Sequence, residues 1–175
     1  MEPLIIRAVN PYEVEQLQAI SKQTFFESFS SVNTEENMRQ YLEEGFSLDK
    51  LAAELGNELS QFYFAILDGR VIGYLKLNKG QAQTDIADNN ALEIERIYVL
   101  KPYHGKQVGQ MLYAKAIDVA GQEGASYVWL GVWEHNPRAI SFYQKNGFIP
   151  FDKHVFMLGT DKQMDILMKK VLKQD

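Results

Sequence analysis

The chain has 175 residues, of which 46% are hydrophobic and 23% charged, so it has a globular composition and is long enough for one compact domain. It contains no cysteine, which excludes disulfides, thiolate metal sites and a cysteine nucleophile and fits an intracellular location best. Its formal net charge of −5 argues against a nucleic-acid-binding surface, because phosphate binding relies on clustered Lys and Arg, and suits a cationic partner or simply solubility.

The first third of the chain is predicted to begin with a strand and to continue as helices. Leu4 to Val9 is a short apolar run of the kind found in strands. From Tyr12 to Phe29 the apolar residues recur at three-to-five-residue spacing, as one buried helix face requires. A second helix is predicted after the capping sequence Asn33 to Glu36, and Leu48 to Leu59 extends the helical pattern after an interruption near Gly45.

A β-hairpin is predicted in the middle of the chain. Two strand-like runs, Gln61 to Leu67 and Val71 to Leu77, flank Asp68-Gly69, a dipeptide that suits a two-residue turn with positive φ. Gly73 indicates a bulge or a close backbone approach. The polar segment from Lys79 to Asn90 has no periodic pattern, so we expect a loop there that covers a site.

A β-α-β unit follows the hairpin. It consists of a strand from Leu92 to Leu100, a helix from Gly109 to Gln122 and a strand from Tyr127 to Val132. Pro137 then starts another helix that runs to Asn146, and Gly147 suits the left-handed cap at its end.

The carboxyl-terminal part is predicted to add two strands. Phe151 to Leu158 reads as a strand, whereas Gln163 to Leu172 fits a strand or a short helix, and we prefer the strand. The chain has no repeat, linker, signal peptide or apolar run of about 18 residues. We therefore expect one domain over residues 1–175 with a mixed α/β (α+β) fold. We also expect a soluble cytoplasmic protein that does not insert in a membrane and that is a monomer or a homodimer.

The loop between the first strand and the helix of the β-α-β unit is a candidate anion site. Small residues there let backbone N–H groups approach an anion, and the helix N-terminus adds a partial positive charge, so a pyrophosphate would be stabilised. The loop lacks the Gly-Lys-Ser/Thr ending of a Walker loop and the G-x-G-x-x-G pattern. An ordinary strand-to-helix turn is the alternative interpretation.

Two segments resemble the GNAT superfamily of N-acetyltransferases. The family's loop pattern is Gln or Arg, two residues, Gly, one residue, then Gly or Ala; this chain has His104 to Gly109 there and departs from the pattern at His104 and Gln107. The second segment, Val132 to Phe148, preserves the family's Asn, Ala, Phe-Tyr and Gly-Phe pattern. The resemblance covers roughly Leu4 to Leu172, and it implies a GNAT fold with a mixed sheet of about seven strands that splays between the fourth and fifth.

This resemblance implies acetyl-CoA as co-substrate and no metal. Backbone groups of Ile97 and Val99 would pair with pantetheine as an added strand would, and the Ile97 N–H would stabilise negative charge on the carbonyl oxygen of the acetyl group. Plainer alternatives are helix capping for Asn136 and ordinary core packing for Ala139 and Phe142. The other residues that the resemblance places at the cofactor are Tyr98, His104, Gly105, Lys106, Gln107, Val108, Gly109, Gln110, Tyr143 and Lys145.

Tyr143 occupies the position that faces the CoA sulfur in many GNAT enzymes, where a phenol can protonate the departing thiolate. The resemblance therefore makes it the candidate general acid, and aromatic packing beside Phe142 is the alternative. His135 and His154 lack a metal-like spacing and receive no role.

An ammonium substrate must lose a proton before its nitrogen attacks the thioester, so a carboxylate is needed near the sulfur. Glu93 and Glu95 are the candidates, and Glu93 matches the position of the base in some relatives. Because they lie two residues apart on one strand, we expect them on the same face as Ile97 and Val99. Solvation at the surface or cation binding is the alternative for either carboxylate.

Within the superfamily, the helical region before the hairpin, Leu92 to Leu100 and the ending Asp165 to Lys170 resemble the PaiA-type bacterial polyamine acetyltransferases. That likeness implies spermidine or spermine as the small-molecule amine, and acidic residues between Asn33 and Glu44, with Asp85 and Asp88, would attract the polycation. The alternatives are acetylation of another small amine or a protein N-terminus, or a non-catalytic acyl-CoA-binding regulatory module, which Gln107 suggests. A DNA-binding regulator is disfavoured because no basic recognition helix is present.

Overall fold

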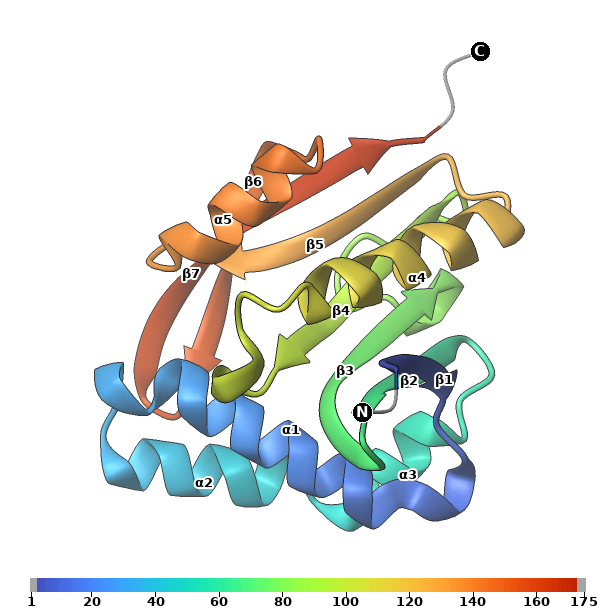
Figure 1. The fold of residues 1–175 in the computed structure, drawn as a ribbon. Helices are drawn as coiled ribbons and strands as arrows, with labels where there is room; N and C mark the ends of the chain where they lie inside the picture. The colour runs from blue at the N-terminus through green and yellow to red at the C-terminus, as the bar shows by residue number, and fades with distance from the viewer. Residues whose placement is uncertain (1–2, 173–175) are drawn as a thin grey trace.

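A computed structural model describes residues 3–172 (Figure 1). Its seven-stranded sheet has the order β1-β2-β3-β4-β5-β7-β6, in which β4 and β5 pair in parallel and the other neighbours pair antiparallel. This arrangement confirms the predicted mixed sheet. The strands are β1 (Ile5–Ala8), β2 (Ser60–Leu67), β3 (Arg70–Lys79), β4 (Ala91–Val99), β5 (Tyr127–Trp133), β6 (Ile149–Leu158) and β7 (Asp161–Val171).

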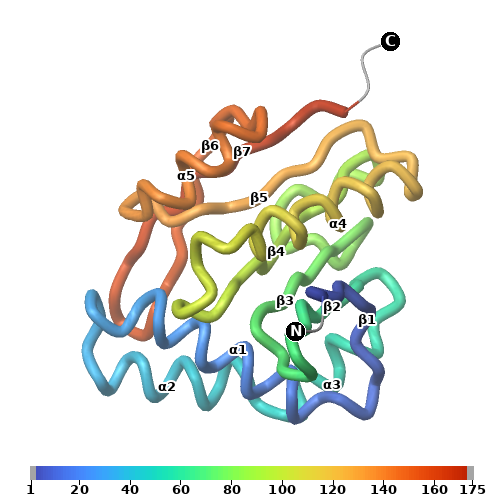
Figure 2. Tube along the Cα trace, in the orientation of Figure 1, coloured from blue at the N-terminus to red at the C-terminus, as the bar shows by residue number. Residues whose placement is uncertain are grey.

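Helices cover the sheet, and all the predicted ones are present. Figures 1 and 2 show α4 in front of the central strands and α5 in front of β6 and β7, with α1 to α3 gathered at the lower end of the view. None of the helices within residues 3–172 is long and apolar enough to cross a membrane. The helices are α1 (Val14–Phe29), α2 (Glu35–Gly45), α3 (Leu48–Leu55), α4 (Val108–Gln122) and α5 (Pro137–Lys145), with 3₁₀ turns η1 (Pro11–Glu13), η2 (Ser30–Val32), η3 (Gly80–Ala82) and η4 (Lys101–Tyr103).

Local capping explains where α2 and α3 begin. The Thr34 hydroxyl accepts the N–H of Asn37, and the Ser47 hydroxyl accepts that of Lys50, so each satisfies a free donor of a first helical turn. The predicted interruption after Gly45 is therefore confirmed. The predicted extension of the second helical stretch to residue 59 is wrong, because the chain turns at residues 56–59 after the end of α3.

The hairpin of β2 and β3 has the predicted two-residue turn. Asp68 and Gly69 have φ values of 51° and 75°, as a turn with two left-handed residues requires. Gly73 lies against β4, where an added Cβ would be 2.7 Å from the carbonyl oxygen of Tyr98. A side chain at this position would push β3 and β4 apart, which confirms the predicted close approach.

A bulge in β4 changes which side chains share a face. Lys76 of β3 lies opposite Arg96, but the next residue of β3 lies opposite Ile94, so Glu95 is the extra residue of the bulge. The expectation that Glu93 and Glu95 face the same way as Ile97 and Val99 is therefore wrong. The two carboxylates line one cavity together with Arg96 and Tyr98.

The predicted splay separates β4 from β5. The two strands pair from Ala91 opposite Tyr127 to Ile94 opposite Leu130, and residues 131–133 of β5 continue by pairing with β7. Residues 96–99 of β4 pair with β3. Beyond these pairs, each strand has an edge that does not pair with the other strand. The space between the two edges belongs to the candidate site.

Candidate active site

The splay opens into a cleft of about 680 Å³, which we call the CoA cleft. It is bounded by the ends of β4 and β5, the loop before α4, one side of α5 and the end of α1. Lys106 and Lys145 lie outside this lining; the Lys106 ammonium is 5.8 Å from the centre of the Tyr103 ring. The predicted cofactor residues that line the cleft are Ile97, Tyr98, Val99, His104, Gly105, Gln107, Val108, Gly109, Gln110, Asn136, Ala139, Phe142 and Tyr143.

The cleft edge of β4 presents backbone groups that β5 does not use. The N–H of Leu100 donates to Ile72 of β3 at 2.8 Å, whereas the carbonyl of Val99 accepts from His104 at 2.7 Å, on the other edge. The N–H and C=O groups of successive residues in a strand point to alternate edges. Those of Ile97, two residues before Val99, therefore face the cleft as well. This edge can bind a linear chain of amides such as pantetheine.

The loop before α4 keeps the geometry of an anion site despite its departure from the family pattern. Gln107 has a φ of 68°, in the left-handed region that glycine adopts most easily, and Gly105 has a φ of 80°. A non-glycine residue costs about 1–2 kcal/mol in that region. The loop conformation is therefore the one that a glycine would give. The first turn of α4 contains no acidic residue that would repel a phosphate.

Arg138 is a residue of the cleft that the sequence interpretation missed. Its Nη1 atom donates to Nδ1 of His104 at 2.6 Å, while Nε2 of the same ring contacts the Val99 carbonyl. In these contacts Nδ1 accepts and Nε2 donates. The contact brings a guanidinium from α5 to the phosphate loop on the other side of the splay. The signal in the sequence was its place two residues after Asn136 in the preserved signature.

The helix α5 holds the candidate general acid. Asn136 caps it by accepting the N–H of Ala139 at 3.2 Å, which confirms the capping interpretation. Tyr143, about two turns after the cap, is 8% exposed and packs against Phe142 and Phe148, with ring centres 5.4 and 5.7 Å away. Burial raises the pKa of Tyr143 far above its ordinary value, so the phenol stays protonated.

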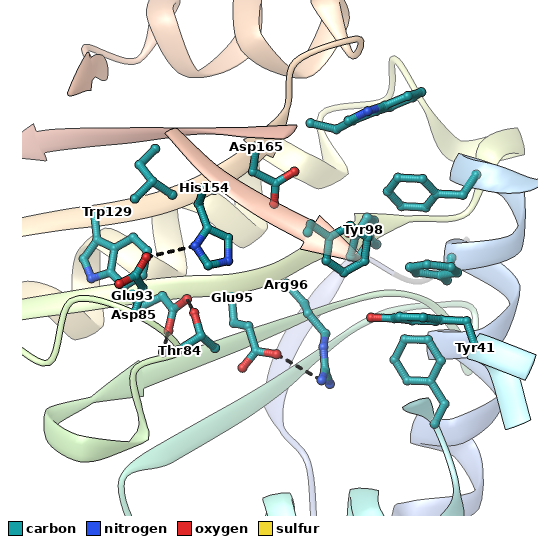
Figure 3. Close-up of a pocket in the computed structure, with 17 residues that line it drawn as sticks. Tyr41, Thr84, Asp85, Glu93, Glu95, Arg96, Tyr98, Trp129, His154 and Asp165 are labelled. Atoms are coloured by element: carbon teal, nitrogen blue, oxygen red, sulfur yellow. Dashed lines mark hydrogen bonds and ion pairs between the residues drawn. The ribbon is translucent and has the colours of Figure 1, made fainter. Parts of the chain in front are cut away.

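A second cavity of about 250 Å³, which we call the acidic cavity, adjoins the cleft (Figure 3). The predicted covering loop contributes Thr84 and Asp85 to its wall, whereas Asp88 hydrogen-bonds Tyr127 instead. Its aromatic walls are Phe25, Phe29, Tyr41, Phe46, Trp129, Trp133 and Phe156, with Tyr98 at the junction. Residues lining both spaces are Phe29, Glu95, Tyr98, Gly131 and Trp133, and the carboxylates of the acidic cavity are Asp85, Glu93, Glu95 and Asp165.

Glu93 is almost completely buried, with 3% exposure. Its carboxylate accepts the Asn78 amide at 3.0 Å, the backbone N–H of Thr84 at 2.8 Å and the Thr84 hydroxyl. Burial raises the pKa of Glu93 above its usual value, although these hydrogen bonds act in the opposite direction. A carboxylate with a raised pKa is a stronger base once it is ionised.

Glu95 belongs to a buried network of ion pairs. It lies 2.7 Å from the Lys76 ammonium and 3.0 Å from the Arg96 guanidinium, and both cations also contact Glu54 of α3. Burial opposes ionisation of Glu95, but the positive charges of Arg96 and Lys76 outweigh it and hold the pKa of Glu95 below its usual value. Glu95 therefore stays ionised and is a weaker base than Glu93.

The features of the cleft fit an acyl-CoA. The open edge of β4 suits the amides of pantetheine, and the loop N–H groups with Arg138 suit its phosphates. Among residues 3–172, no three His, Asp or Glu side chains are close enough together to hold a metal ion.

Comparison with known proteins identifies the family. The model of the acetyltransferase (GNAT) family matches residues 15–148. The chain is 42% identical over 164 residues to an uncharacterized N-acetyltransferase of Lactobacillus delbrueckii subsp. lactis, covering 94% of this chain and 95% of the relative. It is 27% identical over 147 residues to the spermidine N(1)-acetyltransferase of Thermoplasma acidophilum, covering 82% and 86% of the two chains.

Among solved structures, the PaiA N-acetyltransferase of Thermoplasma acidophilum in complex with coenzyme A matches with a TM-score of 0.81 and 25% identity. The match covers 98% of this chain and 100% of that one. The chain therefore belongs to the GNAT acetyltransferase family, and it is an N-acetyltransferase that uses acetyl-CoA as co-substrate.

Proposed function

We propose that this enzyme transfers the acetyl group to a primary amine of a polyamine, with spermidine and spermine as the preferred class. The observation that carries the proposal is the acidic cavity, in which four carboxylates and aromatic walls surround the space next to the CoA cleft. Carboxylates and aromatic faces both attract ammonium groups. The name of the Thermoplasma relative, a spermidine N(1)-acetyltransferase, supports the same substrate class.

The proposed reaction begins with deprotonation of the amine. A proton leaves the ammonium nitrogen for Glu93, through water, because the raised pKa of Glu93 makes it a better acceptor than Glu95. The ionised Glu95 lines both spaces and attracts the ammonium to their junction. The neutral nitrogen then attacks the carbonyl carbon of the thioester.

The remaining groups would assist bond cleavage. The N–H of Ile97, on the open edge of β4, stabilises negative charge on the carbonyl oxygen. As the C–S bond breaks, the phenol of Tyr143 gives its proton to the sulfur and CoA leaves as a thiol, while the second proton of the attacking nitrogen restores the phenol as the amide forms. His104, Arg138 and the loop N–H groups hold the phosphates. The cytoplasmic location stays a prediction from the sequence.

The alternative of a non-catalytic regulatory module rested on Gln107 in place of a glycine. Gln107 adopts the left-handed conformation that a glycine would adopt there, so the substitution does not reshape the loop. This removes the observation that favoured the module, and we retain the enzymatic proposal.

The test measures CoA release with a panel of acceptors: spermidine, spermine, butylamine and a peptide with a free N-terminus. We expect turnover with both polyamines and a kcat/KM at least about tenfold higher than with butylamine, because one added ion pair contributes about 1.4 kcal/mol or more. Inertness of both polyamines, or a preference for the peptide, would overturn the polyamine proposal. Binding of acetyl-CoA without turnover of any acceptor would revive the regulatory module.

A further inference from the structure

We propose that Asp165 and Trp133 form a subsite for a second ammonium group of the acceptor, so that the enzyme selects amines that carry at least two positive charges. The inference rests on the proposed function, because it assumes that the acceptor enters the acidic cavity. It adds the residues that would determine which amines are accepted.

The sheet places the two side chains next to each other. Asp165 of β7 pairs with Trp133 of β5 on one side and with His154 of β6 on the other. Directly paired residues of neighbouring strands project from the same face of a sheet. All three line the acidic cavity, and Figure 3 shows the Asp165 carboxylate projecting into it above Tyr98.

Asp165 differs from the other carboxylates of the cavity because, among residues 3–172, the neighbouring His154 ring acts on it only at a distance and contacts Asp85 instead. Glu93 accepts from Asn78 and Thr84, Glu95 pairs with Lys76 and Arg96, and Asp85 contacts His154 at 3.1 Å. Within residues 3–172, Asp165 makes no hydrogen bond or ion pair with another side chain, although it is half-buried. A half-buried carboxylate without a direct hydrogen bond or ion pair is costly, and a cation from outside would offset that cost.

The walls around Asp165 suit an ammonium group better than an anion or a large side chain. The Trp133 ring lies 5.6 Å from that of Phe29, and Phe29 lies 6.5 Å from Phe156, and these three rings line the same cavity as the carboxylate. Aromatic faces stabilise cations by cation–π interaction. Gly131 leaves space beside Asp165, because an added Cβ would be 3.4 Å from a carboxylate oxygen.

The position of Asp165 also separates it from the reacting nitrogen. The junction of the cleft and the cavity is lined by Glu95, Tyr98 and Trp133, which contribute to both spaces. Asp165 lines the acidic cavity but not the CoA cleft. An acceptor with one nitrogen at the junction would therefore place a second nitrogen toward Asp165, and a monoamine would leave this carboxylate unpaired.

The experiment compares 1,4-diaminobutane with butylamine, which has the same carbon chain but one charge. In the wild-type enzyme we expect a higher kcat/KM for the diamine. In Asp165→Asn we expect kcat/KM for the diamine to fall by about 10- to 100-fold, mainly through KM, while the value for butylamine changes less than about twofold. Asp152→Asn on exposed β6 removes the same charge outside the cavity and should leave the preference intact.

The outcomes separate this inference from the proposed function. If the wild-type enzyme acetylates neither amine nor any polyamine, the proposed function fails. If it acetylates both amines but shows no preference, or if Asp165→Asn lowers both values equally, the second-ammonium subsite is wrong while the proposed function stands. Turnover of butylamine and the melting temperature show whether Asp165→Asn is folded. If it does not fold, Asp165→Ser takes its place.

Discussion

Replacing Tyr143 by Phe removes one hydroxyl from the wall of the CoA cleft and keeps the ring that packs against Phe142 and Phe148. Within the described residues the hydroxyl has no hydrogen-bond partner, so its loss breaks no contact inside the protein. We therefore expect the melting temperature to stay the same. A change in turnover would then report on chemistry and not on folding.

The expected size of the effect follows from the leaving group. A thiol with a pKa of about 8.5 leaves as a thiolate more easily than an alkoxide would, so the phenol contributes less than in many other reactions. We expect turnover to fall by about 10- to 1000-fold, or about 1.4–4 kcal/mol in activation free energy. The affinity for CoA should be nearly unchanged, because the phosphates and pantetheine are held elsewhere in the cleft.

The assay follows the free thiol that appears as spermidine is acetylated, and calorimetry measures CoA binding. Tyr113→Phe is the matched control, because Tyr113 is 4% exposed on α4 and its hydroxyl receives a hydrogen bond from Lys170 at 3.0 Å, outside the cleft. It should lose about 0.5–1.5 kcal/mol of stability and keep its turnover. Unchanged turnover in Tyr143→Phe would refute the assignment of the general acid.

Two further predictions concern the base and the loop. Glu93 must be unprotonated to accept a proton, and its pKa is raised, so activity should fall as the pH decreases through this raised value. Glu93→Gln should lower turnover about 100-fold and abolish this loss of activity at low pH. An unchanged pH profile in the variant would exclude Glu93 as the base. At residue 107, Gln107→Gly should unfold about 1 kcal/mol less readily than Gln107→Ala in urea, because its φ is 68°; equal stabilities would contradict the strain assigned to this position.

Much of the fold could be predicted because its signals are local. The Asp68-Gly69 turn, the capping residues Thr34 and Asn136, and the order of strand, loop and helix in the β-α-β unit each depend on a few neighbouring residues. The preserved signature near Asn136 is also local, and it led to the prediction of the CoA cleft. The turn, the two caps and the order of the elements were confirmed, whereas the extension of the second helical stretch beyond Leu55 was wrong.

The acidic cavity was beyond such reasoning because its residues come from distant parts of the chain. The bulge at Glu95 is accompanied by ion pairs from Lys76 on β3, and Glu54 on α3 joins the same network, so no pattern within β4 indicates it. Strand alternation, applied to β4 alone, therefore gave the wrong face for Glu93 and Glu95. Asp165 likewise became a candidate only once β5, β6 and β7 had been paired.

The most direct measurement of the central claim is a crystal structure of the enzyme with CoA and spermidine bound. The account predicts pantetheine hydrogen-bonded to the open edge of β4 at Ile97 and Val99, and the sulfur within about 3–4 Å of the Tyr143 hydroxyl. It also predicts one spermidine nitrogen at the junction of the two spaces and a second beside Asp165. Pantetheine on another edge of the sheet, or spermidine bound outside the acidic cavity, would contradict it.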